Sequence, residues 1–174
     1  MSIKTTVRSL AARATMREDD VRAYLHQDHV EVLDLAKRMH EAKKASVRKV
    51  LLGKLKPALS AHARAEEKEV YETLLSVRSQ ESHDYGNEGF VEHSLVDELL
   101  KRLDKGVGDT DAWKAEAKVL YELLQHHIDE EQRDVFSNLG EHFDADQLAV
   151  IGEKFLATKR RLLTPKKPVK KKVA

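Results

Sequence analysis

The sequence contains no cysteine, and this absence removes several kinds of site at once. Disulfides, iron–sulfur clusters, thiolate zinc sites and cysteine nucleophiles are excluded, so a metal ion would need histidine and carboxylate ligands. Glycine (7), proline (3) and aromatic residues (5%) are scarce, whereas 35% of the 174 residues are charged. This composition is typical of long, surface-exposed helices and excludes an all-β fold, and the length is that of one domain.

Long apolar runs are also absent. No segment approaches the roughly 20 apolar residues that span a bilayer, and the N-terminal region has no apolar signal-peptide segment. We therefore expect a soluble, cytoplasmic protein without a membrane partner.

Charge is distributed unevenly, although the formal net charge is only +1. Residues 1–17 hold four basic residues and no acidic one, and residues 159–174 hold eight basic residues and no acidic one, so all 30 acidic residues fall in 18–158. We expect a basic N-terminal arm over 1–17 and, because Pro165 and Pro168 disfavour helix, a flexible lysine-rich tail over 159–174. Such a tail supports weak, salt-sensitive contact with nucleic acid.

Hydrophobic periodicity predicts an all-α fold over residues 18–158. The expected main helices run from the Thr15–Glu18 capping spacing to about Ala45, from Ser46 to about Ser76, from Phe90 to Lys105, and from Asp109 or Thr110 to Gly140. Residues 78–87 are predicted as a connection, and Asp144 to about Lys159 as a short fifth helix. Pro57 predicts a kink or a late start in the second helix.

The predicted helices form two similar halves. Residues 28–39 (DHVEVLDLAKRM) align with 92–103 (EHSLVDELLKRL), and residues 59–74 (LSAHARAEEKEVYETL) align with 124–139 (LQHHIDEEQRDVFSNL). The histidines of each half are separated by nearly the same interval, 33 residues from His29 to His62 and 34 from His93 to His127. Short connections within each helix pair predict an up-down-up-down four-helix bundle.

The alignment superposes polar residues that lie on the apolar faces of the helices. His62 and Glu66 are four residues apart, so they share one helix face with Leu59 and Val70. The complete set of candidate ligands is His29, His62, Glu66, His93, His127 and Glu131. Burial without partners would cost several kcal/mol for each group, whereas two divalent metal ions would satisfy all six. This donor set suits iron first, with manganese or zinc as substitutes.

Other histidines are assigned no role. About one residue in six is acidic, so a single H-x-x-x-E pair is weak evidence, and the pair His126–Glu130 is one residue out of the repeat register. The histidines without a repeat counterpart are His26, His40, His83 and His142. For the six aligned residues, the alternative to a metal site is a buried hydrogen-bond network.

The pattern H…HxxxE…H…HxxxE resembles the hemerythrin-like (HHE cation-binding) family over about residues 20–158. The resemblance implies a non-haem di-iron centre in which Glu66 and Glu131 bridge the metals, with open positions for oxygen species. It places His29 and His62 on one iron and His93 and His127 on the other. Oxygen-carrying hemerythrins have a further histidine where this chain has Asp97, itself a candidate weak ligand, and their last carboxylate lies one residue farther from its histidine. These departures favour sensing, nitric oxide or peroxide handling, or iron storage over reversible dioxygen carriage.

Three functions remain open at this point. The leading hypothesis is a di-iron protein that binds dioxygen, nitric oxide or peroxide as a sensor, scavenger or reservoir. The second is a di-iron oxidoreductase with peroxidase-like turnover; a ferritin-like oxidase is excluded because none of the nine histidines has a glutamate three residues before it. The third is a structural bundle that binds nucleic acid or a partner protein through its basic tail.

Overall fold

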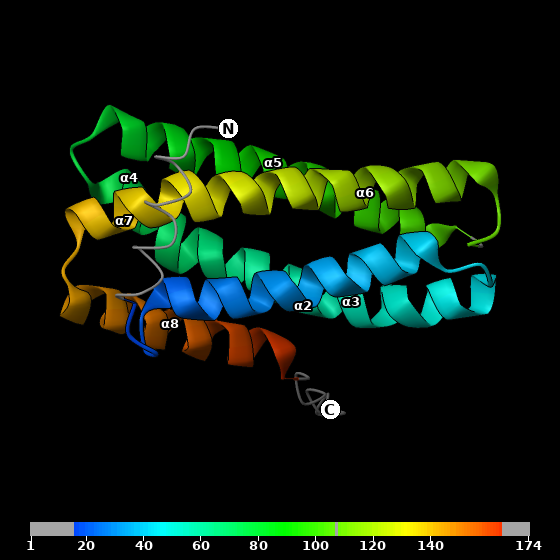
Figure 1. The fold of residues 1–174 in the computed structure, drawn as a ribbon, viewed down its shortest axis with the longest axis horizontal. Helices are drawn as coiled ribbons and strands as arrows, with labels where there is room; N and C mark the ends of the chain where they lie inside the picture. Colours follow the sequence, from blue (N-terminus) through cyan, green and yellow to red (C-terminus); the bar gives the residue numbers. More distant parts are fainter. Residues whose placement is uncertain (1–15, 107, 165–174) are drawn as a thin grey trace, which may run out of the picture.

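A computed structural model describes residues 16–106 and 108–164, and the regular secondary structure of these residues is entirely helical. The long helices α2 (Val21–Glu41), α3 (Ala45–Glu66), α5 (Gln80–Lys105) and α6 (Asp111–Glu130) lie alongside one another (Figure 1). The chain continues from α3 into η1 (Glu67–Tyr71) and α4 (Glu72–Ser76), and from α6 into η2 (Glu131–Val135) and α7 (Phe136–His142). The last helix, α8 (Ala145–Leu163), packs against α2 and α3. The predicted all-α class is confirmed.

The first helix begins later than predicted. Its N-cap is Asp20, whose carboxylate accepts a hydrogen bond from the backbone N–H of Arg22 and so satisfies one unpaired donor of the first turn. Glu18 lies in the turn before this cap, and Thr15 lies outside the described residues. The predicted Thr15–Glu18 capping box is therefore not the start of the helix.

Pro57 neither delays nor ends its helix, since α3 runs from Ala45 to Glu66 with Pro57 inside it. The irregular turns lie farther along, at η1 and η2, which are both π-helical. A π-helical turn contains an extra residue, and such turns are frequent at functional sites. The two π segments begin at Glu67 and Glu131, next to or at the candidate carboxylate ligands.

The predicted connection over 78–87 is wrong, because α5 begins at Gln80 behind the N-cap Ser79. The predicted connection is a polar segment that contains Gly86, but glycine in this helix has a packing role. A Cβ atom at Gly89, one turn on, would lie 2.4 Å from the ring of Tyr71. Glycine there allows α5 to approach the large side chain at the end of η1.

The fifth helix is not short: α8 has 19 residues, against 20 in α6. Asp144 and Gln147 form a complete capping box at its start, and the buried side chains of Leu148, Ile151 and Phe155 anchor it to the bundle. Since α8 extends to Leu163, residues 159–163 are helical rather than part of the predicted tail. The rest of that tail (165–174) and most of the predicted arm (1–15) lie outside the described residues.

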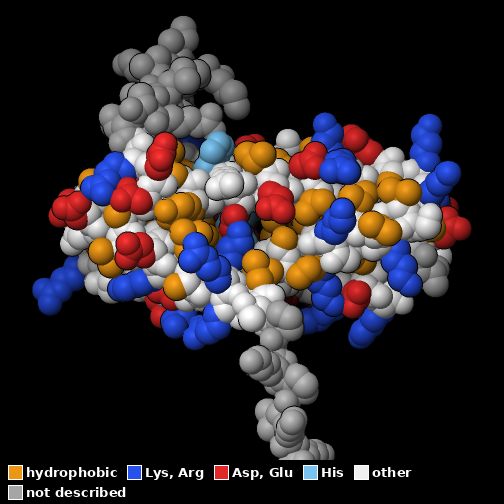
Figure 2. All heavy atoms as spheres, turned by 90° about the horizontal axis from the view of Figure 1, so that it is seen from below, with side chains coloured by type: hydrophobic (Ala, Val, Ile, Leu, Met, Phe, Trp, Pro, Cys, Tyr) orange, Lys and Arg blue, Asp and Glu red, His pale blue; other side chains and the backbone are white. Residues whose placement is uncertain are grey.

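The surface of the described chain carries mixed charge. On the face shown in Figure 2, basic and acidic side chains are interspersed with apolar ones, so this face offers no continuous basic surface. Among the described residues, none of the helices has the length and apolar character that a membrane span requires.

The apolar core is divided into two clusters along the bundle axis. The first apolar cluster lies toward the α2–α3 connection and includes Leu35, Met39, Leu55, Leu103 and Trp113. The second apolar cluster lies at the end formed by α4 and α7 and includes Leu25, Val70, Leu74, Leu139 and Phe155 (Figure 1). A layer of buried polar side chains lies between them.

Candidate metal centre

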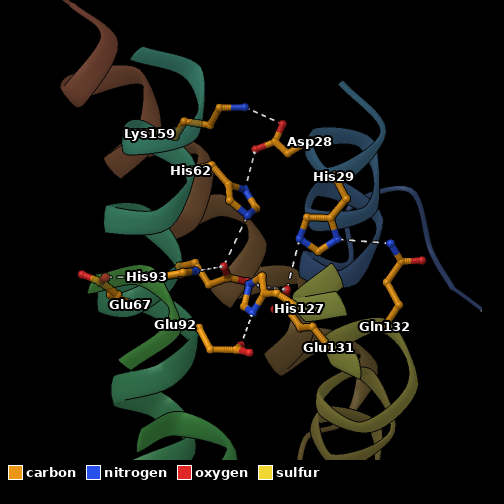
Figure 3. A network of polar contacts seen from close by, with 11 residues as sticks. Asp28, His29, His62, Glu67, Glu92, His93, His127, Glu131, Gln132 and Lys159 are labelled. Carbon is orange, nitrogen blue, oxygen red and sulfur yellow. Dashed lines mark hydrogen bonds and ion pairs between the residues drawn. The ribbon is translucent and has the colours of Figure 1, made fainter. Parts of the chain in front are cut away.

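The buried polar layer contains all six candidate ligands. Their exposed fractions lie between 0% and 5%. His29 comes from α2, His62 and Glu66 from α3, His93 from α5, His127 from α6 and Glu131 from the first position of η2. The structure thus brings together residues from four helices at one depth of the bundle (Figure 3).

Each carboxylate contacts histidines from both halves of the repeat. The Nε2–Oε2 distances are 3.3 Å for His62–Glu66, 3.5 Å for His93–Glu66, 3.1 Å for His29–Glu131 and 3.6 Å for His127–Glu131. The ring centroids of His29 and His62 are 5.0 Å apart, and those of His93 and His127 are also 5.0 Å apart. The arrangement is therefore two histidine pairs with two carboxylates between them.

Several atoms of this cluster are buried without a hydrogen-bond partner among the described residues. They are both carboxylate oxygens of Glu66, both of Glu131, and Nε2 of His29 and of His127. An unsatisfied buried polar group costs about 1–3 kcal/mol, so an apolar core does not explain this layer. Ligand atoms of His29, His62 and Glu66 lie within 4.8 Å of one another, as do those of Glu66, His93 and His127. The residues present fit a metal ion in each group.

The other ring nitrogen of every histidine faces a residue outside the cluster. The Nδ1 contacts are His62 with Asp28 Oδ2 (3.2 Å), His93 with Glu67 Oε1 (3.1 Å), His127 with Glu92 Oε2 (2.6 Å) and His29 with Gln132 Nε2 (3.2 Å) (Figure 3). We call Asp28, Glu67, Glu92 and Gln132 the outer partners. A carboxylate that accepts the Nδ1–H of an imidazole orients the ring so that its second nitrogen points at a bound metal, and three of the four histidines have such a partner. His29 instead faces the amide nitrogen of Gln132.

The family comparison agrees with this geometry. A model of the hemerythrin HHE cation-binding domain matches residues 20–139. The chain belongs to this family. A comparison with curated proteins and another with solved structures gave no significant match. The range that matches the hemerythrin HHE domain includes the six candidate ligands and the four outer partners, whereas α8 follows it.

The outer partners of this HHE domain were not predicted from the sequence, although one signal was visible. An acidic residue precedes the first histidine of each half, Asp28 before His29 and Glu92 before His93. In the structure each of these acids contacts the second histidine of its own half, His62 or His127. An acidic residue beside a candidate histidine ligand in both halves would have been enough to nominate Asp28 and Glu92.

Ion pairs extend the network outward from the outer partners. Lys159 of α8 donates a hydrogen bond to Asp28, which joins the last helix to the centre. Arg64 pairs with Glu67 at 2.8 Å and with Asp97 at 2.9 Å. Asp97, the candidate weak ligand, thus contacts Arg64 and lies outside both groups of clustered ligand atoms.

Two of the histidines without a repeat counterpart make contacts outside the group of six candidate ligands. His26 Nδ1 is 3.1 Å from Oε1 of the outer partner Gln132. His83 Nε2 lies 2.8 Å from the backbone oxygen of Val77, close to the start of α5.

Burial and charge shift the pKa values of the ligands in different directions. Burial lowers the pKa of His29 to about 4 against the opposing charge of Glu131. Burial also opposes the charge of His62, but the Glu66 carboxylate and the hydrogen bond to Asp28 outweigh it and raise that pKa to about 10. Burial and the nearby Glu131 charge raise the pKa of Glu66 to about 8. In the metal-free protein, protons therefore occupy part of the ligand set at neutral pH.

Two hollows adjoin the centre. An inner cavity lies beside the four histidines and is lined otherwise by apolar side chains, Val32, Leu59, Val96, Leu124 and Ile128. A second pocket reaches His127 and Glu131 from a mouth that includes Glu88, Glu92 and Glu130, and Tyr71 lines it as well. We call this second pocket the acidic pocket. The centre thus has an apolar side and an acidic side.

Proposed function

We propose that this HHE domain holds two non-haem iron ions and binds a small oxygen species, either dioxygen, nitric oxide or peroxide, for sensing, scavenging or storage. His29, His62, His93 and His127 would be terminal ligands, and Glu66 and Glu131 would bridge the ions. Manganese and zinc are the expected substitutes. The observation that carries this proposal is the convergence of buried, unpartnered carboxylate oxygens with histidine nitrogens that are oriented from outside.

The proposal includes an up-down-up-down order of α2, α3, α5 and α6. Short connections and the contacts of α2 with α3, of α5 with α6, and of α2 with α6 support this order. In such a bundle each helix delivers its ligands to the same depth.

The protein side chains define what such a centre would admit. Val32, Leu59 and Val96 line the inner cavity and exclude water from one side of the histidines. Bound iron would supply open coordination positions and redox chemistry there. Because this side of the centre is apolar, it would favour a small uncharged ligand of the iron, such as dioxygen or nitric oxide, over an ion.

Peroxidase-like turnover is the second candidate function. The hydroxyl of Tyr71 is buried without a hydrogen-bond partner among the described residues and belongs to a side chain that lines the acidic pocket. A hydroxyl there can donate a hydrogen bond to an oxygen species at the centre. Steady-state consumption of peroxide or nitric oxide by the iron-loaded protein would distinguish an enzyme from a binder.

The central test is metal analysis of protein purified from iron-supplied cells, with an optical spectrum. The expected result is two iron ions per chain and loss of metal in His62→Ala. His83→Ala is the matched control, because His83 contacts a backbone oxygen away from the centre. A folded, metal-free wild-type protein would contradict the proposal.

A further inference from the structure

A second group of metal-ligating side chains lies outside the buried centre. Ligand atoms of Glu92, His126 and Glu130 lie within 4.8 Å of one another, and His126 Nε2 is 3.2 Å from Glu130 Oε2. Unlike the six central residues, this group is accessible, since the exposed fractions of its side chains are 63% for His126, 36% for Glu130 and 15% for Glu92. A carboxylate pair with one imidazole suits a divalent cation.

The group is linked to the centre through Glu92. Oε2 of Glu92 accepts a hydrogen bond from Nδ1 of His127, and the two atoms are 2.6 Å apart. That hydrogen bond fixes the position of the Glu92 carboxylate between the centre and the exposed group. Glu92 thus contacts a candidate ligand of the centre and is also a member of the exposed group.

The acidic pocket connects the exposed group to the buried centre. Glu92 and Glu130 line it, and its other charged lining residues include Glu88, Asp134 and Glu131. Nε2 of His127 and both carboxylate oxygens of Glu131 are buried without hydrogen-bond partners among the described residues, and both side chains line this pocket. A pocket lined mainly by carboxylates concentrates cations and accelerates their entry. The pocket thus brings a cation to candidate ligand atoms that have no hydrogen-bond partner among the described residues.

We propose that Glu92, His126 and Glu130 form a transient entry site that captures a divalent cation from solvent and delivers it through the acidic pocket to the buried centre. The inference rests on the proposed metal centre. Exposure of two of the three ligands makes the entry site weak, so an ion held there exchanges readily, whereas the buried centre retains it. The entry site therefore governs the rate of loading and not the final metal content.

The test is stopped-flow loading of the metal-free protein with Co²⁺, followed by absorbance, with the final stoichiometry measured separately. Glu130→Gln should slow loading by about tenfold, at the lower end of the usual range for electrostatic attraction of a ligand into a charged cleft. His126→Ala should also slow loading, because it removes a ligand nitrogen from the entry site. Both variants should still reach two ions per chain. Added salt should slow the wild type more than Glu130→Gln, because screening removes the same attraction.

Glu122→Gln is the matched control. Glu122 is on the same helix, is exposed, and pairs with Lys118 four residues before it, so the charge change is identical. Its loading rate should equal that of the wild type. Unchanged rates in His126→Ala and Glu130→Gln, or an equal slowing in Glu122→Gln, would overturn the entry site while leaving the centre in place. Failure of the wild type to bind Co²⁺ would instead overturn the proposed function.

Discussion

Glu67 and Gln132 occupy equivalent positions in the two halves of the chain, and each contacts Nδ1 of a histidine from the opposite half. Glu67 has a carboxylate whose Oε1 lies 3.1 Å from Nδ1 of His93, whereas Gln132 has an amide whose Nε2 lies 3.2 Å from Nδ1 of His29. The pair His93–His127 therefore has two carboxylate outer partners, and the pair His29–His62 has one. The pseudo-symmetric centre has unequal halves.

We expect unequal metal affinities as a result, because a carboxylate on Nδ1 raises the basicity of the coordinating imidazole. Titration with Zn²⁺ should show two classes of site. Glu67→Gln should weaken the tighter class by about tenfold, and Gln132→Glu should strengthen the weaker one. Titration curves that fit a single class in the wild type and both variants would rule out this asymmetry.

Loss of a carboxylate should remove more metal than loss of a histidine. Glu66 contacts His62 of one pair and His93 of the other, so Glu66→Ala should disturb both ions. His29→Ala should disturb mainly the ion at its own pair. Metal content per chain is the measurement, and equal losses in the two variants would argue against bridging.

Metal affinity should rise with pH through the neutral range. Burial lowers the pKa of His62, but the Glu66 carboxylate and Asp28 outweigh it and hold that pKa at about 10, so His62 carries a proton at pH 7 in the metal-free protein and metal must displace it. Binding should therefore release protons, which a pH indicator in weak buffer detects. The melting temperatures of metal-loaded and metal-free protein should accordingly converge between pH 7.5 and about pH 5 as protons displace the metal. Binding without proton release would contradict this protonation state.

Gly89→Ala should destabilise the fold, because the new Cβ would lie 2.4 Å from the ring of Tyr71. The expected loss is about 1–3 kcal/mol in the free energy of unfolding, the usual cost of overpacking. Gly53→Ala is the control: its Cβ would meet nothing within 4 Å, so α3 should gain about 0.5–1 kcal/mol. Urea unfolding of both variants measures the difference, and equal effects would exclude the clash.

The sequence was sufficient to nominate the six central residues because their signal is local. His62 and Glu66 lie one turn apart on an apolar face, and the pattern recurs in the second half. The outer partners depend instead on how helices cross. Glu67 follows a buried glutamate and would face elsewhere on a regular α-helix, whose residues are about 100° apart. It is buried at the start of the π-helical η1, which no periodicity in the sequence indicates.

The predicted helix boundaries were wrong where the same residue type can serve two different structural roles. Gly86 lies in the polar segment that was predicted as a connection, yet in α5 a Cβ there would lie 3.2 Å from Leu75, so glycine permits close packing. Lys159 falls within the predicted flexible tail, whereas in the structure it belongs to α8 and is paired with Asp28 of α2. Only the tertiary arrangement distinguishes these outcomes.

The position of the polar layer between the first and second apolar clusters has a consequence for cooperativity. Each cluster is stabilised by its own contacts, and the buried histidines and glutamates interrupt the apolar packing that would join them. A metal pair at this depth would act as a cross-link among four helices at mid-length. Without it, we expect the two ends of the bundle to open separately, so amide hydrogen exchange should report two opening free energies where the loaded protein has one.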